Sequence, residues 1–127
     1  PASAQALHAV LVEAWPRLEG RVSLVASSIA DVSLHEGDVV VSSHACGTLT
    51  DEILAHATTA GARVAVLPCC HDLRACDPGP IAGWVDRPLA IDVRRAQRLE
   101  QRGYRVWTQT IPVEVTPKNR LLLASPR

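Results

Sequence analysis

The sequence predicts an α/β domain whose sheet is mostly parallel and finishes in a C-terminal antiparallel hairpin. Two short runs of apolar residues, 38–43 and 63–67, are typical of strands that are buried on both faces of a parallel sheet. Segments with helical periodicity alternate with these runs, and such alternation favours an α/β architecture. Two further strand-like segments flank a turn at residues 116–119, which predicts the hairpin.

The expected elements follow in the order helix, strand, strand, helix, strand, helix and hairpin. Their ranges are 2–18, 21–28, 38–43, 48–60, 63–67, 89–102, 105–115 and 120–124. Apolar residues recur at spacings of three and four from Leu7 to Leu18, which indicates the first helix. Gly20, Gly61 and Gly103 each follow a helical segment and are expected to end it. Residues 72–88 are rich in proline and predict a long loop.

Composition narrows the class of protein. The 127 residues are enough for one domain, expected over residues 1–127. Thirteen basic residues balance thirteen acidic ones, so nothing favours tight, sequence-independent binding of nucleic acid, although a local patch could still bind it. No apolar run reaches the roughly 20 residues of a membrane helix, and we find no signal peptide. Four cysteines, two of them adjacent, argue against a disulfide framework and favour a cytoplasmic setting.

Segments rich in histidine and cysteine follow two of the predicted strands. His44-Ala45-Cys46-Gly47 comes after the strand at 38–43, and Pro68-Cys69-Cys70-His71 comes after the strand at 63–67. In open α/β sheets ligands bind at the carboxyl ends of the strands. If the two strands are parallel neighbours, the imidazole and thiol groups of both segments converge on one edge. The helix that begins near Thr48 would direct its N-terminus to the same place.

These two motifs together resemble one branch of the class I S-adenosylmethionine-dependent methyltransferases. The branch includes RNA 2′-O-methyltransferases of the Trm13 type and the methyltransferase-like domains of glutathione-transferase-C-terminal-domain proteins. The likeness is strongest over residues 39–72, where His44-Ala45-Cys46-Gly47 is followed by Thr50-Asp51 and then by Pro68-Cys69-Cys70-His71. It extends more weakly to the turn at residues 116–120. Each motif alone is weak, whereas the pair at this spacing is fairly specific.

The resemblance implies a Rossmann-like sheet, S-adenosylmethionine as cofactor and a role for each loop. Residues 21–28 would be the third strand of the family's sheet, with its end near the adenine. The residues expected to bind the cofactor are Ser28, Ile29, Asp31, Ser43, His44, Ala45, Cys46 and Gly47. The residues expected on the substrate side are Cys69, Cys70 and His71.

The resemblance also implies that strands 1 and 2 of the family are missing, together with their glycine-rich loop and ribose-binding acid. We therefore interpret the chain as a partial methyltransferase domain, a fragment that is inactive alone if truly truncated. Without these strands, the strand at 21–28 would have no pairing partner and the strand at 39–41 would be an exposed edge of the sheet. An exposed apolar edge promotes association. The expected partners are a second copy of the chain or the missing N-terminal half.

Methyl transfer depends mainly on positioning, because the sulfonium is already a strong electrophile. An oxygen or nitrogen acceptor would gain from a base, for which His44 and Asp51 are the candidates and His71 the third. Asp51 also lies in a first helical turn, where an acid is favoured for dipole reasons alone. The acceptor stays open among RNA, protein and a small molecule.

Two other interpretations stay open. The first is a metal-binding module for zinc or an iron–sulfur cluster, since the side chains are suitable ligands, although no Cys-x-x-Cys pair is present. Its candidate ligands are His44, Cys46, Cys69, Cys70, His71 and Cys76. The second is a non-catalytic methyltransferase-like fragment or partner subunit that kept the fold and lost the cofactor.

Overall fold

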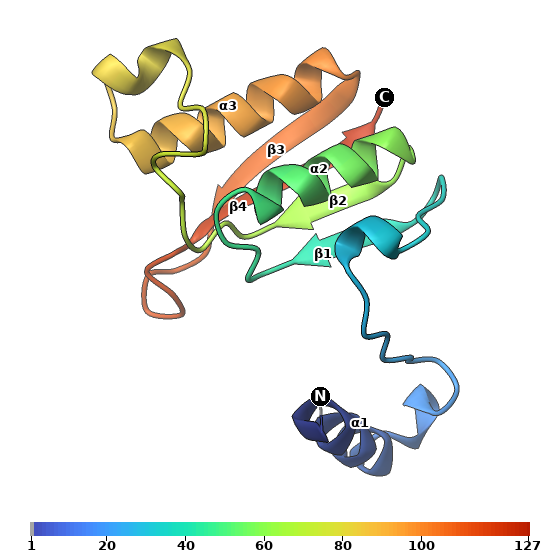
Figure 1. The fold of residues 1–127 in the computed structure, drawn as a ribbon. Coiled ribbons are helices and arrows are strands. Elements are labelled where there is room, and N and C mark those ends of the chain that lie inside the picture. Colours follow the sequence, from blue (N-terminus) through green and yellow to red (C-terminus); the bar gives the residue numbers. More distant parts are fainter. Residues whose placement is uncertain (1) are drawn as a thin grey trace. The chain divides into compact units, whose positions relative to one another are not determined.

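The computed structural model describes residues 2–127. These residues divide into two compact units, one ending at Val32 and the other spanning Ser33–Arg127 (Figure 1). The first unit holds one helix and two single turns. The second holds the sheet, the other helices and both motifs.

The first unit begins with helix α1 (Ala2–Ala14), which is followed by the 3₁₀ turns η1 (Pro16–Leu18) and η2 (Ile29–Asp31). The helix is shorter than expected because Pro16 disfavours helical geometry in the residue before it. Trp15 accordingly lies at φ −133° and ψ 82°. No residue of α1 is buried within the described chain.

The strand expected at residues 21–28 is wrong. These residues form no strand, and the side chains of Val22, Leu24 and Val25 are exposed. A strand needs a neighbour to accept and donate its backbone hydrogen bonds. Within residues 2–127 no strand pairs with this segment, so its β-branched composition alone does not make it one.

The second unit is built on a four-stranded sheet in the order β1-β2-β4-β3. Its strands are β1 (Val39–Ser42), β2 (Arg63–Val66), β3 (Tyr104–Thr110) and β4 (Arg120–Pro126). The expected hairpin is confirmed, since β3 and β4 pair antiparallel from Tyr104 to Thr110.

The expectation of a mostly parallel sheet is wrong, because only the pairing of β1 with β2 is parallel. The hairpin folds β4 back between β2 and β3, and both pairings of β4 are therefore antiparallel. As a result β1, β2 and β3 all point in the same direction, and their carboxyl ends share one edge of the sheet.

Helices α2 (Leu49–Thr59) and α3 (Arg87–Gln101) lie on one face of this sheet (Figure 1). Helix α3 begins two residues earlier than expected, because the Asp86 carboxylate accepts the N–H of Leu89 and caps it. The apolar core between helices and sheet is formed by Ile53, Leu54, Ala57, Val64, Val66, Ile91, Leu99, Leu122 and Ala124. No helix within residues 2–127 has the length and apolarity needed to cross a membrane.

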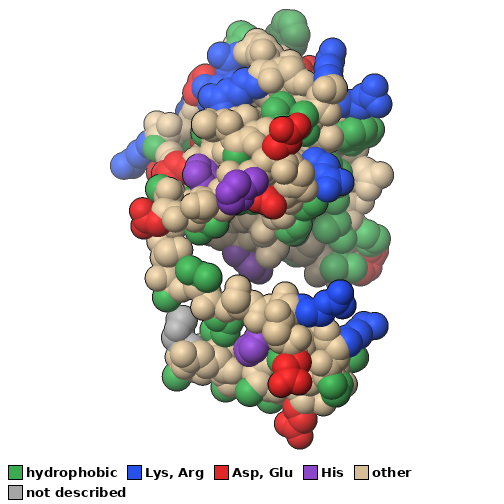
Figure 2. All heavy atoms as spheres, turned by 90° about the vertical axis from the view of Figure 1, so that its right-hand side faces the viewer, with side chains coloured by type: hydrophobic (Ala, Val, Ile, Leu, Met, Phe, Trp, Pro, Cys, Tyr) green, Lys and Arg blue, Asp and Glu red, His purple; other side chains and the backbone are tan. Residues whose placement is uncertain are grey.

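The opposite face of the sheet is apolar and partly bare. Side chains of Val39, Val41 and Trp107 are 55%, 73% and 48% exposed, and hydrophobic side chains gather along one flank of the larger unit in Figure 2. Burial of residues 38–43 on both faces, expected from their composition, is therefore wrong. Within the second unit, β1 is an edge strand and both α-helices cover the other face.

Candidate functional site

The two motif loops meet at the carboxyl ends of β1 and β2. The N–H of Gly47 donates to the carbonyl of Cys70 at 2.9 Å, and the Sγ atoms of Cys46 and Cys69 lie 3.3 Å apart. The parallel pairing of the strands sets this arrangement, since Ser42 and Val66 are register partners at the strand ends. The expected convergence of the two loops is confirmed.

Gly47 is required by the fold of its own loop. Its φ is +59°, and an added Cβ would lie 3.3 Å from the Cβ of Asp72. A side chain at this position would therefore be strained and would press against the second loop. The side of Gly47 on which a Cβ would lie is packed against Asp72.

Three thiols cluster where the loops meet. The Sγ atoms of Cys46, Cys69 and Cys70 all lie within 4.8 Å of one another. Cys46 and Cys70 are exposed, and Cys69 is partly buried. The hydrogen bond between Cys46 and Cys69 raises the pKa of Cys46 to about 11 and lowers the pKa of Cys69.

A buried arginine ties the first loop to α3. Arg95 is 1% exposed, and its guanidinium contacts both carboxylate oxygens of Asp51, at 2.7 and 3.2 Å. It also donates to the carbonyl of Gly47 at 2.9 Å and to Asp92 at 3.2 Å. Burial alone would lower the pKa of Arg95, but the hydrogen bond and charge of Asp51 and the charge of Asp92 raise it. Arg95 is therefore a buried cation between two carboxylates.

The second motif loop is held by Asp92, the residue of α3 that also pairs with Arg95. The Nε2 atom of His71 lies 2.7 Å from Asp92 Oδ1, and the side chains are 5% and 11% exposed. The other carboxylate oxygen of Asp92 accepts from Nε of Arg120 at 2.8 Å. This histidine–carboxylate pair has the arrangement of a base with its orienting acid.

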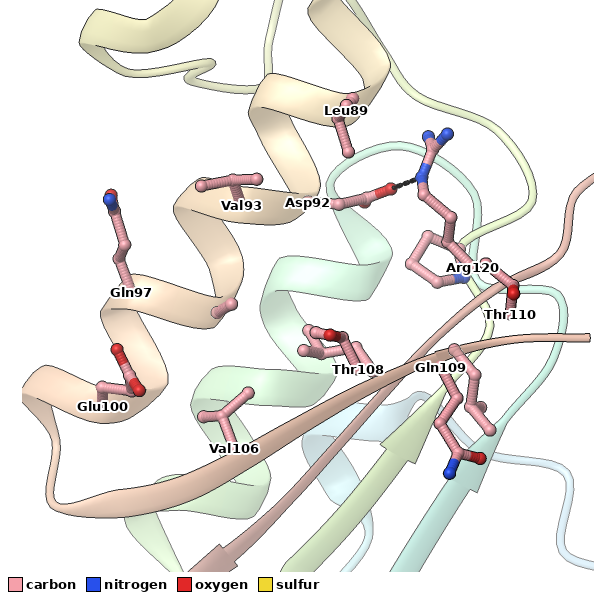
Figure 3. A pocket seen from close by; sticks show the side chains of 14 residues that line it. Leu89, Asp92, Val93, Gln97, Glu100, Val106, Thr108, Gln109, Thr110 and Arg120 are labelled. Atoms are coloured by element: carbon pink, nitrogen blue, oxygen red, sulfur yellow. Dashed lines mark hydrogen bonds and ion pairs between the residues drawn. The ribbon is translucent and has the colours of Figure 1, made fainter. Parts of the chain in front are cut away.

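Two hollows adjoin this pair. A polar pocket of about 230 Å³ is lined by Pro68, His71, Asp86, Pro88, Pro117, Lys118, Asn119 and Arg120. A larger groove of about 670 Å³ runs between α3 and the β3–β4 hairpin. Figure 3 shows Leu89 and Val93 on the helix side of this groove, with the ion pair of Asp92 and Arg120 beside them. Pro68 and Arg120 line both hollows, so the two are adjacent.

The remaining residues expected from the sequence lie in two places. In the loop after β1, Ser43 and His44 are exposed and Ala45 is buried. In the first unit, the Ser28 hydroxyl accepts from the N–H of Ala30, next to Ile29 and the exposed Asp31. The role of these three residues toward adenine stays a prediction.

Sequence reasoning missed Asp92, Arg95 and Arg120. One signal for Arg95 was present, because it lies at spacings of four between Ile91 and Leu99. Those two residues form the buried stripe of α3, and a charged residue on such a stripe needs a buried partner. Nothing in the sequence indicates that Asp51, 44 positions away, is that partner.

Comparison with known families gives a match to this chain. A family model described as a methyltransferase domain matches residues 3–76, which is more than half of the chain. The matched segment contains both motif loops, whereas α3 and the hairpin lie outside it. Neither the curated proteins nor the solved structures include a significant match. On this match, the chain belongs to a family of methyltransferase domains.

Proposed function

We propose that the chain acts in S-adenosylmethionine-dependent methyl transfer to an oxygen or nitrogen nucleophile, in the branch of Trm13-type and related enzymes. Membership of the methyltransferase family supports the reaction. The observation that carries the choice of site is the hydrogen bond between Gly47 and Cys70, which joins both motif loops at the carboxyl edge of parallel strands.

The loop after β1 suits one side of the cofactor. Ser43, His44 and Cys46 are exposed there, so their hydroxyl, imidazole and backbone groups are free to face a ligand. With Ala45 and Gly47 they would hold the cofactor. The cofactor supplies a methyl group on a positively charged sulfur. The chain's own residues supply the position of the reacting groups and a place for the acceptor's proton.

The structure changes which residue we favour as the base. The Asp51 carboxylate is bound by Arg95 on both oxygens, so we assign Asp51 a positioning role for the first loop. His71 is better placed, because it lines a pocket and Asp92 orients its ring. When Nε2–H is donated to Asp92, Nδ1 of His71 is the atom that accepts a proton. His44 stays a candidate on the cofactor side.

The pocket beside His71 favours an acceptor that carries phosphate. Lys118 contributes positive charge to its wall, as does Arg120, which also pairs with Asp92, and Asn119 contributes an amide. The carboxylate of Asp86 in the same wall is engaged by the N–H of Leu89. Basic and amide side chains contact the backbone of nucleic acids. RNA is therefore the acceptor we propose to test first, with Cys69 and Cys70 on the same side as His71. We propose a cytoplasmic setting, because closely spaced free thiols persist in a reducing compartment.

The test begins with binding. We expect calorimetric titration of the chain with S-adenosylhomocysteine to release heat at a stoichiometry of one. With radiolabelled S-adenosylmethionine, we expect label in RNA and its loss in His71→Asn and Asp92→Asn. His35→Asn is the matched control, since His35 is exposed and its partner is Asp38. Absence of both heat and transfer would favour a non-catalytic fragment or partner subunit. Label in protein or a small molecule instead would refute the choice of RNA.

A further inference from the structure

Three thiols cluster in the loops that the proposed function places against the cofactor and the acceptor, and none of them serves there as the base. Cys46 comes from the loop after β1, whereas Cys69 and Cys70 come from the loop after β2. Their Sγ atoms lie within 4.8 Å of one another, and those of Cys46 and Cys69 are 3.3 Å apart. Zinc holds thiolate sulfurs at about 2.3 Å, which places tetrahedral ligands about 3.8 Å from one another. The observed spacing is close to that of a zinc–thiolate site.

From this geometry we infer that Cys46, Cys69 and Cys70 bind a thiophilic divalent cation of the zinc class through three thiolates. The adjacent cysteines are no obstacle, because both of their sulfurs reach the third thiol. Of the other candidate ligands, His44 lies outside the group of ligand atoms within 4.8 Å of one another, and two are engaged elsewhere. His71 contacts Asp92, and Cys76 lies 3.7 Å from both Asp51 and Arg95.

The loops that carry the thiols are held in place without a metal. The hydrogen bond from the N–H of Gly47 to the carbonyl of Cys70 joins the two loops beside the thiols. Ser42 accepts from the N–H of Leu67 at 2.8 Å, which fixes the start of the second loop. After the last thiol, the carboxylate of Asp72 accepts from the N–H groups of Arg74 and Ala75. A ligand set held by its surroundings costs little ordering entropy when the ion binds.

Three ligands leave one position of a tetrahedral ion open. Exposure of Cys46 and Cys70 places that position within reach of solvent. Structural zinc sites are closed by four protein ligands, whereas catalytic sites keep one exchangeable position. The site is therefore of the open kind, with water or a donor atom of a bound molecule as fourth ligand. Binding one divalent ion replaces three thiol protons, which are released to solvent, and leaves the site with a net charge of −1.

The experiment uses the full chain in a reducing buffer with a phosphine reductant. Zinc is titrated against a chromophoric chelator, and cobalt is added separately to report thiolate ligation by its charge-transfer absorption. We expect one equivalent of zinc and a cobalt spectrum typical of several thiolates. Cys46→Ser, Cys69→Ser and Cys70→Ser should each lose the bound equivalent. Cys76→Ala is the matched control, because this fourth thiol lies outside the cluster, and it should keep the ion.

Circular dichroism of each variant shows whether the fold is retained. The zinc titration of the wild-type chain tests the proposal even if the variants do not fold. The proposal is overturned if the wild-type chain takes up less than one equivalent of zinc and gives no charge-transfer band. It is equally overturned if the three serine variants bind as the wild type does, or if a disulfide between Cys46 and Cys69 resists the reductant and excludes the ion. No cofactor or acceptor enters this test, so failure of the proposed methyl transfer leaves its result unchanged.

Discussion

Arg95 and Asp51 form a two-point ion pair, at 2.7 and 3.2 Å, between the middle of α3 and the first turn of α2. The cation is 1% exposed and its partner 29%. The same guanidinium reaches the carbonyl of Gly47 in the first motif loop. A contact that joins two helices to that loop links the stability of the core to the shape of the site.

The Arg95→Met variant tests this link. Removing the cation of a buried ion pair leaves the Asp51 carboxylate without its two-point partner, while Asp92 keeps Arg120, so we expect a loss of about 3–5 kcal/mol in unfolding free energy. Urea denaturation followed by circular dichroism measures it. The control is Arg94→Met on the same helix, whose side chain is 31% exposed and pairs with Asp77. It should cost less than about 1 kcal/mol. Equal losses in the two variants would contradict the role of Arg95.

Tyr104 predicts a dependence of stability on alkaline pH. Burial raises the pKa of this phenol, whose hydroxyl donates to the carbonyl of Ala62 at 3.0 Å. The raised value means that the folded state favours the neutral form. The stabilisation is therefore complete below the unfolded pKa of about 10 and is lost as pH rises through the folded pKa.

The measurement is direct because Tyr104 is the single tyrosine of the chain. Phenolate absorbance should appear at higher pH in the folded chain than in the chain unfolded by urea. Identical titration curves would show that the ring is not buried as described. At neutral pH, Tyr104→Phe should cost about 1 kcal/mol through the lost hydrogen bond.

Gly47 and Gly83 should respond in opposite ways to alanine. At Gly47 the positive φ and the contact with Asp72 make a Cβ unfavourable, and we expect a loss of about 1–2 kcal/mol. At Gly83 no atom lies within 4 Å of an added Cβ. There the reduced freedom of the unfolded chain should stabilise by about 0.4–1 kcal/mol. Denaturant midpoints compare the two, and a stabilised Gly47→Ala would contradict the loop geometry.

The edge strand predicts self-association. Val41 lies in β1 and is 73% exposed on the bare side of the sheet, so we expect the chain to form dimers as its concentration rises. Val41→Lys should shift sedimentation toward the monomer, because a charged edge strand pairs poorly. Val113→Lys is the control, since Val113 is 62% exposed but lies outside the strands. A wild-type chain that sediments as a monomer at every concentration would refute the prediction.

Local patterns in the sequence predicted much of the second unit. Apolar runs marked β1 and β2, the turn at residues 116–119 marked the hairpin, and the two motif loops were expected at one edge. These inferences depend on neighbours in the chain or on the general geometry of parallel strands. They held because the elements find their partners within the described residues.

Inferences that needed distant partners failed. Residues 21–28 have the composition of a strand, but no neighbouring strand satisfies their backbone groups. The position of β4 between β2 and β3 depends on tertiary packing, and no local sequence pattern in these strands indicates it. Arg95, which binds both carboxylate oxygens of Asp51, lies 44 residues away from it, and no local pattern indicated that contact.

The uncovered side of the sheet has a consequence for handling and for biology. Water in contact with Val39, Val41 and Trp107 adds to the free energy of the isolated chain, and that excess disappears when another surface excludes it. A molecule that binds and covers this face will therefore stabilise the folded chain. Above its Kd, the stabilisation rises with the logarithm of its concentration. A screen for molecules that raise the melting temperature would therefore identify binding partners of this face, whichever molecule accepts the methyl group.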